Sequence, residues 1–224
     1  MSLHALPSDP LLQRHRLVHV RSAAWRAWLA SRSDLANEPL LSGWVDRGWP
    51  LIVRRPVPGE GSGLPLGLPL PPSAGKRRIA LQMAAGDIVA TTPLPTLAEC
   101  VDTAPAAWQP SLWQLATHAR AYGVEARVFG SLAWQRLTGL TYLSSNSDLD
   151  IVWTLPDRNR ISWFLSDLAD IDSLAPVRID GELLRADGAG VNWRELHSGA
   201  PELVLKTAAE VILCQRESFI GMPS

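Results

Sequence analysis

The chain is poor in the residues that build disulfide frameworks and zinc sites. Its 224 residues contain only two cysteines, Cys100 and Cys214, which are too few for a disulfide scaffold and favour a reducing compartment. The five histidines show no metal-ligand spacing, and no Ser-His-Asp or Cys-His arrangement can be recognised. The sequence therefore gives no support to a secreted disulfide-rich domain, a zinc site or a catalytic triad.

Long apolar runs are also absent. No stretch of about 18 or more apolar residues is present, so the sequence predicts no membrane span. The segment from Met1 to Arg16 is interrupted by Pro7, Asp9, Pro10 and Arg14, and it lacks the apolar core of a signal peptide. We therefore expect a cytoplasmic protein that does not contact a membrane.

The chain also has little net charge: its formal net charge is −1, which argues against a general nucleic-acid binder. The charges are nevertheless unevenly distributed. Residues 1–100 carry 11 Lys+Arg against 7 Asp+Glu, whereas residues 101–224 carry 10 against 15. A basic half beside an acidic half suits a site that holds a polyanion with arginines and metal-binding carboxylates. Two independently solvated surfaces would give the same distribution.

What the sequence does contain indicates two α+β domains. Four prolines between Thr91 and Pro110 predict a boundary that separates domain 1–106 from domain 107–224. The first is a smaller, basic, Pro/Gly-rich α+β domain for binding substrate or carrier, with an extended loop over 61–75. The second alternates helices and strands, which predicts a mixed sheet flanked by helices, with an α/β-like order. Its last predicted helix runs from Pro201 to Arg216.

Two aspartates in the second domain form the most informative motif. In the predicted strand around Ser147–Val152, Asp148 and Asp150 project to one side while Leu149 and Ile151 point to the other. Two adjacent carboxylates repel each other unless a cation lies between them. Oxygen ligands at this spacing favour Mg²⁺, whose shell substrate phosphates complete. We therefore predict that this pair holds magnesium, with two ions at the site.

A glycine-serine turn and a further acid complete the predicted site. Gly130 and Ser131 lie at a strand-to-helix turn, where free backbone N–H groups can bind a phosphate. In the next predicted strand, Asp180 shares a face with Arg178 and Glu182. We predict Asp180 as a metal ligand or general base, with Glu182 as the second choice, and Arg178 as a phosphate ligand. Chance Asp-x-Asp and Gly-Ser pairs are common, but their order along this chain is specific.

Basic and aromatic side chains supply further candidates. The candidate clamp for substrate phosphates or an acidic carrier protein consists of Arg54, Arg55, Lys76, Arg77 and Arg78. A solvated basic rim is the alternative interpretation. Large aromatic residues could stack on a base but more often belong to a core, and this applies to Trp134, Trp153 and Trp193.

The order of motifs over residues 111–184 resembles the DNA polymerase β-like nucleotidyltransferase superfamily. A closer resemblance covers nearly the whole chain. Segments 49–55, 69–72 and 75–81 look like the N-terminal half of the malonate decarboxylase holo-acyl-carrier-protein synthase family. Segments 144–152, 178–182 and 191–196 look like the C-terminal half of that family, without departure at these motifs.

The resemblance implies a phosphoribosyl-dephospho-CoA transferase. Such an enzyme attaches triphosphoribosyl-dephospho-CoA to a serine of the apo acyl-carrier subunit of malonate decarboxylase and releases pyrophosphate. By the family pattern, Asp148 and Asp150 are the catalytic pair. Two alternatives remain at this point: a nucleotidyltransferase that uses an ordinary NTP on RNA, protein or a small molecule, and a non-catalytic nucleotide-binding module.

Overall fold

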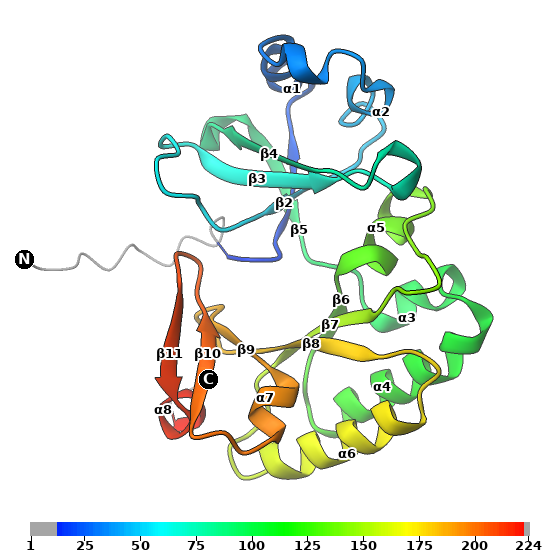
Figure 1. Ribbon diagram of the computed structural model, residues 1–224, viewed down its shortest axis with the longest axis vertical. Helices are drawn as coiled ribbons and strands as arrows, with labels where there is room; N and C mark the ends of the chain where they lie inside the picture. The colour runs from blue at the N-terminus through cyan, green and yellow to red at the C-terminus, as the bar shows by residue number, and fades with distance from the viewer. Residues whose placement is uncertain (1–12, 222–224) are drawn as a thin grey trace, which may run out of the picture. The chain divides into compact units, whose positions relative to one another are not determined.

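The computed structural model describes residues 13–221, which form two compact units that divide between Pro93 and Leu94 (Figure 1). Both units combine a β-sheet with helices, so the expected α+β fold class is confirmed. None of the helices in this range has the length and apolar character needed to cross a membrane. The expected lack of a signal peptide concerns Met1–Arg16, most of which lies outside the described residues.

The first unit is built on a five-stranded antiparallel sheet in the order β4-β3-β2-β1-β5. Trp25 and Trp44 are buried in this unit, and their indole N–H groups donate to the carbonyls of Leu41 and Pro50, respectively. The strands are β1 (Leu17–Val20), β2 (Leu51–Val53), β3 (Leu64–Pro69), β4 (Arg78–Met83) and β5 (Ile88–Thr92). The helices are α1 (Ser22–Ala30), η2 (Ser33–Leu35), α2 (Pro39–Ser42), η3 (Pro72–Ala74) and η4 (Ala85–Asp87).

The expectation of an extended loop over 61–75 is wrong, because this segment contains strand β3. β3 pairs with β2 on one side and with all six residues of β4 on the other. Leu64, Leu66 and Leu68 are buried. Prolines and glycines in the segment disfavour a helix, but they do not prevent an extended strand whose leucines are covered by its neighbours.

The division between the units lies earlier than the expected boundary at 106/107. Helix α3 (Leu97–Cys100) and the 3₁₀ helices η5 (Val101–Thr103) and η6 (Ala106–Trp108) follow the division. Leu97, Cys100, Val101, Ala104 and Trp108 are all buried in the core of the second unit. These side chains attach the proline-containing segment to the second unit.

The second unit contains a six-stranded mixed sheet in the order β11-β10-β9-β8-β7-β6. β7 and β8 are parallel and α6 connects them, whereas the other neighbours are antiparallel. The strands are β6 (Ala126–Val128), β7 (Leu149–Thr154), β8 (Ile179–Leu184), β9 (Gly190–Asn192), β10 (Glu202–Lys206) and β11 (Val211–Gln215).

Helices α4 (Gln109–Ala121) and α6 (Ile161–Leu174) lie side by side against one face of this sheet (Figure 1). Phe164 and Leu168 of α6 share a buried core with Leu149, Ile151 and Trp153 of β7. The remaining helices are α5 (Gly130–Thr138), α7 (Trp193–His197) and α8 (Arg216–Gly221). The alternate side chains of β7 and β8 must therefore face away from α4 and α6.

The predicted helix from Pro201 to Arg216 is wrong, because β10 and β11 form a hairpin there. Leu203 and Leu205 are buried while the residues between and around them are less so, which is the alternation of a strand. Thr207 and Glu210 close the turn, with the Thr207 N–H donating to the Glu210 carbonyl at 2.9 Å. The cross-strand partners of β10 and β11 thus override the helical signal of Pro201.

Candidate active site

Asp148 and Asp150 flank the first residue of β7 on the sheet face that points away from α4 and α6. Leu149 and Ile151 are fully buried in the core, whereas Asp148 and Asp150 are half-buried. Asp148 directly precedes the strand, and Asp150 is its second residue. The alternation that the sequence predicts is therefore present, and a rigid strand holds Asp150.

Asp150 lies against the glycine-serine turn. Gly130 begins α5 with a φ of +65°, and a Cβ atom added there would lie 1.9 Å from Asp150 Oδ2. The backbone N–H of Phe129 donates to the Asp150 carbonyl at 3.0 Å. Only glycine allows the carboxylate this close to the start of the helix. The N-terminus of α5, including the half-buried Ser131, thus adjoins Asp150.

Asp180 lies beside Asp150 on the neighbouring strand. The two residues are paired in register between the parallel strands β7 and β8, so both side chains are on one face. Asp180 Oδ1 accepts hydrogen bonds from the Gly181 N–H and from Asn192 Nδ2, each at 2.8 Å. The third predicted acid therefore belongs to the same sheet surface.

Glu182, the alternative third acid, has a different environment. Its side chain is only 7% exposed, and Lys206 Nζ of β10 lies 2.8 Å from Glu182 Oε1. This ion pair neutralises the buried carboxylate and ties β10 to β8. The geometry thus favours Asp180 over Glu182 as the acid that acts with Asp150. The ion pair with Glu182 also shows that Lys206 has a structural role between β10 and β8.

Arg178 adds a positive charge next to the first carboxylate. Its guanidinium lies 4.0 Å from Asp148 Oδ2, and the side chains of Arg178 and Asp148 are 59% and 41% exposed, respectively. At this exposure the pair is weak, because solvent screens both charges. Arg178 therefore remains available to bind an anionic group near Asp148.

The three aspartates do not make a complete protein cage for a metal. Within residues 13–221, no group of three or more His, Cys, Asp or Glu side chains is gathered closely enough to hold an ion. Magnesium is commonly bound by one or two carboxylates, with waters and substrate phosphates as the other ligands. The donor set of Asp148 and Asp150 fits that mode of binding.

The five basic candidates all lie in the first unit, and two of them have acidic partners there. Arg54 pairs with Glu60 and also donates to the carbonyls of Arg55, Leu66 and Leu81. The hydrogen bond from Arg54 lowers the pKa of Glu60. The guanidinium of Arg54 thus fixes β2, β3 and β4 relative to the loop that contains Glu60.

Three of the other basic candidates, Lys76, Arg77 and Arg78, are exposed. Arg77 donates to Glu38 Oε2 at 2.6 Å but is 48% exposed. Lys76 and Arg78 are exposed, and Arg55 is half-buried. Lys76 and Arg78 therefore fit the description of a basic rim more closely than Arg54 does.

The tryptophans considered for base stacking belong to the core. Trp153 is 0% exposed, Trp193 1% and Trp134 5%. Trp193 also donates its indole N–H to the Ile179 carbonyl at 3.1 Å, which attaches α7 to β8. Asn192, the residue before Trp193, is a functional candidate that the sequence did not reveal. An Asn before a helix indicates an N-cap, but its contact with Asp180 depends on strand pairing.

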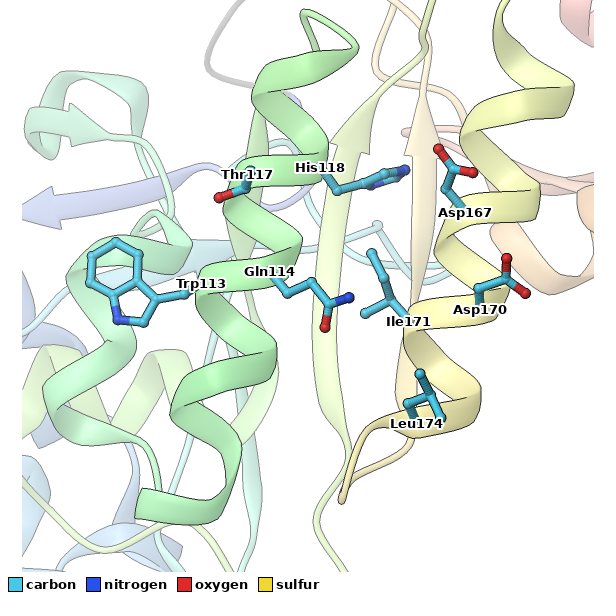
Figure 2. Close-up of a pocket in the computed structure, with 8 residues that line it drawn as sticks. All are labelled: Trp113, Gln114, Thr117, His118, Asp167, Asp170, Ile171 and Leu174. Atoms are coloured by element: carbon cyan, nitrogen blue, oxygen red, sulfur yellow. The ribbon is translucent and has the colours of Figure 1, made fainter.

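A groove of about 530 Å³ lies between α4 and α6, on the other side of the sheet (Figure 2). Its lining includes none of the predicted site residues and consists of Trp113, Gln114, Thr117, His118, Asp167, Asp170, Ile171 and Leu174. Burial lowers the pKa of His118, whose Nε2 lies 3.2 Å from the Phe164 carbonyl. A neutral ring at that position is a packing element of the helix pair.

Comparison with known proteins identifies both units. Residues 13–93 match the family described as phosphoribosyl-dephospho-CoA transferase MdcG N-terminal domain, and residues 96–217 match the corresponding C-terminal domain. Both matches are to parts of a transferase, so the protein is a two-domain transferase. The chain belongs to the phosphoribosyl-dephospho-CoA transferase family.

Curated relatives agree with this assignment over most of their length. A phosphoribosyl-dephospho-CoA transferase of Bradyrhizobium diazoefficiens is 48% identical over 208 residues, which are 93% of this chain and 92% of the relative. A protein of the same name from Xanthomonas euvesicatoria pv. vesicatoria is 38% identical over 94% of this chain and 98% of its own length. Comparison with solved structures gave no significant match.

Proposed function

We propose that this transferase attaches triphosphoribosyl-dephospho-CoA to a serine of the apo acyl-carrier subunit of malonate decarboxylase. The product is a phosphodiester, and pyrophosphate is released. Family membership supports the nature of the donor, because the relatives are named phosphoribosyl-dephospho-CoA transferases. The observation that carries the proposal is the contact of Asp150 with Gly130, which joins a carboxylate to a helix N-terminus suited to phosphate.

The acidic side chains have separate roles in this proposal. Asp148 and Asp150 would hold Mg²⁺, with two ions at the site. Bound magnesium would neutralise charge on the donor's phosphates, as in other phosphoryl transfers. Asp180 is placed on the same sheet face as Asp150, where it would accept the proton of the carrier serine.

The remaining residues would orient the phosphates. The serine oxygen attacks the α-phosphorus, the bond to the pyrophosphate oxygen breaks, and the serine proton passes to Asp180. The backbone N–H groups at Gly130 and Ser131 would receive the leaving pyrophosphate, and Arg178 would bind a phosphate oxygen beside Asp148. Since positioning and charge neutralisation supply most of the acceleration in such reactions, small displacements of these groups have large effects.

The cellular setting is part of the same proposal. Cys100 and Cys214 are free thiols, as expected of a cytoplasmic protein. The acceptor in this proposal is a protein, and the proposal assigns no role to a nucleic acid or a membrane.

The experiment is an intact-mass measurement of the purified apo acyl-carrier subunit after incubation with this protein, Mg²⁺ and the donor. We expect the carrier mass to increase by the prosthetic group, and we expect Asp150→Asn to abolish the increase. Asp170→Asn is the matched control, because Asp170 is an exposed aspartate of α6 outside the site. Transfer from ATP alone would favour a general nucleotidyltransferase, and no transfer from either donor would indicate a non-catalytic module.

A further inference from the structure

Asn192 connects the proposed base, Asp180, to the start of helix α7. Asn192 is the last residue of β9 and the N-cap of α7. Its Nδ2 donates to Asp180 Oδ1 at 2.8 Å, and its Oδ1 accepts the Arg194 backbone N–H at 2.9 Å. One side chain thus satisfies the helix end and contacts a site carboxylate at the same time.

The two hydrogen bonds on Asp180 fix the direction of its carboxylate. The Gly181 N–H and Asn192 Nδ2 both donate to Oδ1. These two hydrogen bonds hold the side chain through Oδ1, and Oδ2 takes part in neither of them. A carboxylate held by one oxygen can present the other to a reacting group without rotating away from it.

The amide of Asn192 has only one orientation that satisfies both contacts. Its oxygen must face the Arg194 N–H, because an amide NH₂ group cannot accept that hydrogen bond. The NH₂ group therefore faces Asp180. A flipped amide would place its oxygen against the carboxylate and lose both interactions.

Helix α7 is itself attached to the strand that contains Asp180. The indole N–H of the buried Trp193 donates to the Ile179 carbonyl at 3.1 Å. The Arg194 guanidinium donates to the same carbonyl at 2.9 Å and to Asp172 Oδ1 at 2.6 Å. The residue before Asp180 and the amide that contacts Asp180 are thus parts of one connected group.

We propose that Asn192 is a positioning residue that holds Asp180 with Oδ2 directed at the carrier serine. This proposal rests on the proposed function, since it assigns Asn192 a task in the same reaction. Asn192 does not act on the substrate. It sets the orientation of the carboxylate that receives the proton, and this effect is separate from its role as a helix cap.

Two substitutions separate the two roles. Asn192→Ser keeps a good N-cap acceptor for the Arg194 N–H, but its shorter side chain lacks the Nδ2 group that donates to Asp180. Asn192→Ala removes both contacts. We expect the Ser variant to melt at the wild-type temperature while its kcat falls about 10- to 100-fold, with unchanged KM for donor and carrier. We expect the Ala variant to show the same loss of kcat and a lower melting temperature.

A second comparison tests whether the effect passes through Asp180. In an Asp180→Asn background, Asn192→Ser should cause no further loss of the single-turnover transfer rate, because the carboxylate that it positions has been removed. All rates are measured below the melting temperature of each variant. If Asp180→Asn leaves no measurable rate, the kcat of the Asn192→Ser single variant decides whether Asn192 has a positioning role.

Two results would overturn the positioning role. One is a wild-type kcat for Asn192→Ser, which would leave Asn192 as a helix cap only. The other is an equal loss in the wild-type and Asp180→Asn backgrounds, which would place the effect elsewhere. Failure of the proposed function is distinguishable, because the wild-type protein itself would then not modify the carrier subunit.

Discussion

Replacing Gly130 by alanine tests whether the contact between the helix start and Asp150 matters for activity. The new Cβ would lie 1.9 Å from Asp150 Oδ2 and 2.7 Å from its Cγ, far inside contact distance. The carboxylate must retreat by roughly 1 Å or more, and a displacement of that size can reduce an enzymatic rate by about 100-fold. Because alanine disfavours the φ of +65°, we also expect the free energy of unfolding to fall by about 1–2 kcal/mol.

Gly139 provides a matched control at the other end of α5. Its φ is +72°, so Gly139→Ala has a similar backbone cost, but its added Cβ would meet nothing within 4 Å. Denaturant unfolding should show a similar loss of stability for both variants. Carrier modification at saturating donor should fall about 100-fold for Gly130→Ala and stay near wild type for Gly139→Ala. Equal transfer rates for the two variants would refute the argument that Asp150 acts where it touches Gly130.

Two further predictions concern stability. Lys206→Met removes the cation that faces the buried Glu182 carboxylate, so we expect the free energy of unfolding measured with denaturant to fall by about 3 kcal/mol. Adding Glu182→Gln should recover most of this loss, because the buried group is then neutral. A loss that Glu182→Gln does not recover would contradict this explanation. The Thr96 backbone N–H lowers the pKa of Glu99, so Glu99 stabilises the fold above its ordinary pKa of 4.5 and this contribution is lost as the pH falls through the lower folded value. The stability difference between wild type and Glu99→Gln should therefore shrink on acidification, and a constant difference from pH 7 to acid would contradict the assignment.

Local patterns were sufficient to predict the core of the candidate site. Alternation along β7 places Leu149 and Ile151 inside, which leaves the flanking aspartates on the other face. The strand-to-helix turn at Gly130 could also be predicted, because glycine and serine there follow an apolar strand. The distance between Gly130 and Asp150 could not be predicted, since it depends on how β6 and β7 pair.

Errors arose where tertiary contacts decide between two local possibilities. Pro201 and the apolar residues after it are compatible with a helix, yet Leu203 and Leu205 lie in a strand because β9 and β11 pair with β10. The prolines of β3 likewise favour a loop when the sequence is considered locally, yet the segment is a strand because β2 and β4 pair with it on both sides. The contact of Asn192 with Asp180 links residues twelve positions apart across β8 and β9, and no spacing rule predicts it.

We propose that Asp148 and Asp150, beside Gly130, form the metal and triphosphate site of this transferase. Anomalous diffraction from crystals grown with Mn²⁺ and the donor tests it most directly, because manganese replaces magnesium and can be located without bias. We expect a manganese peak coordinated by Asp148 or Asp150 and by donor phosphate oxygens, with pyrophosphate oxygens at the start of α5. A donor bound elsewhere, with no manganese at either aspartate, would contradict it.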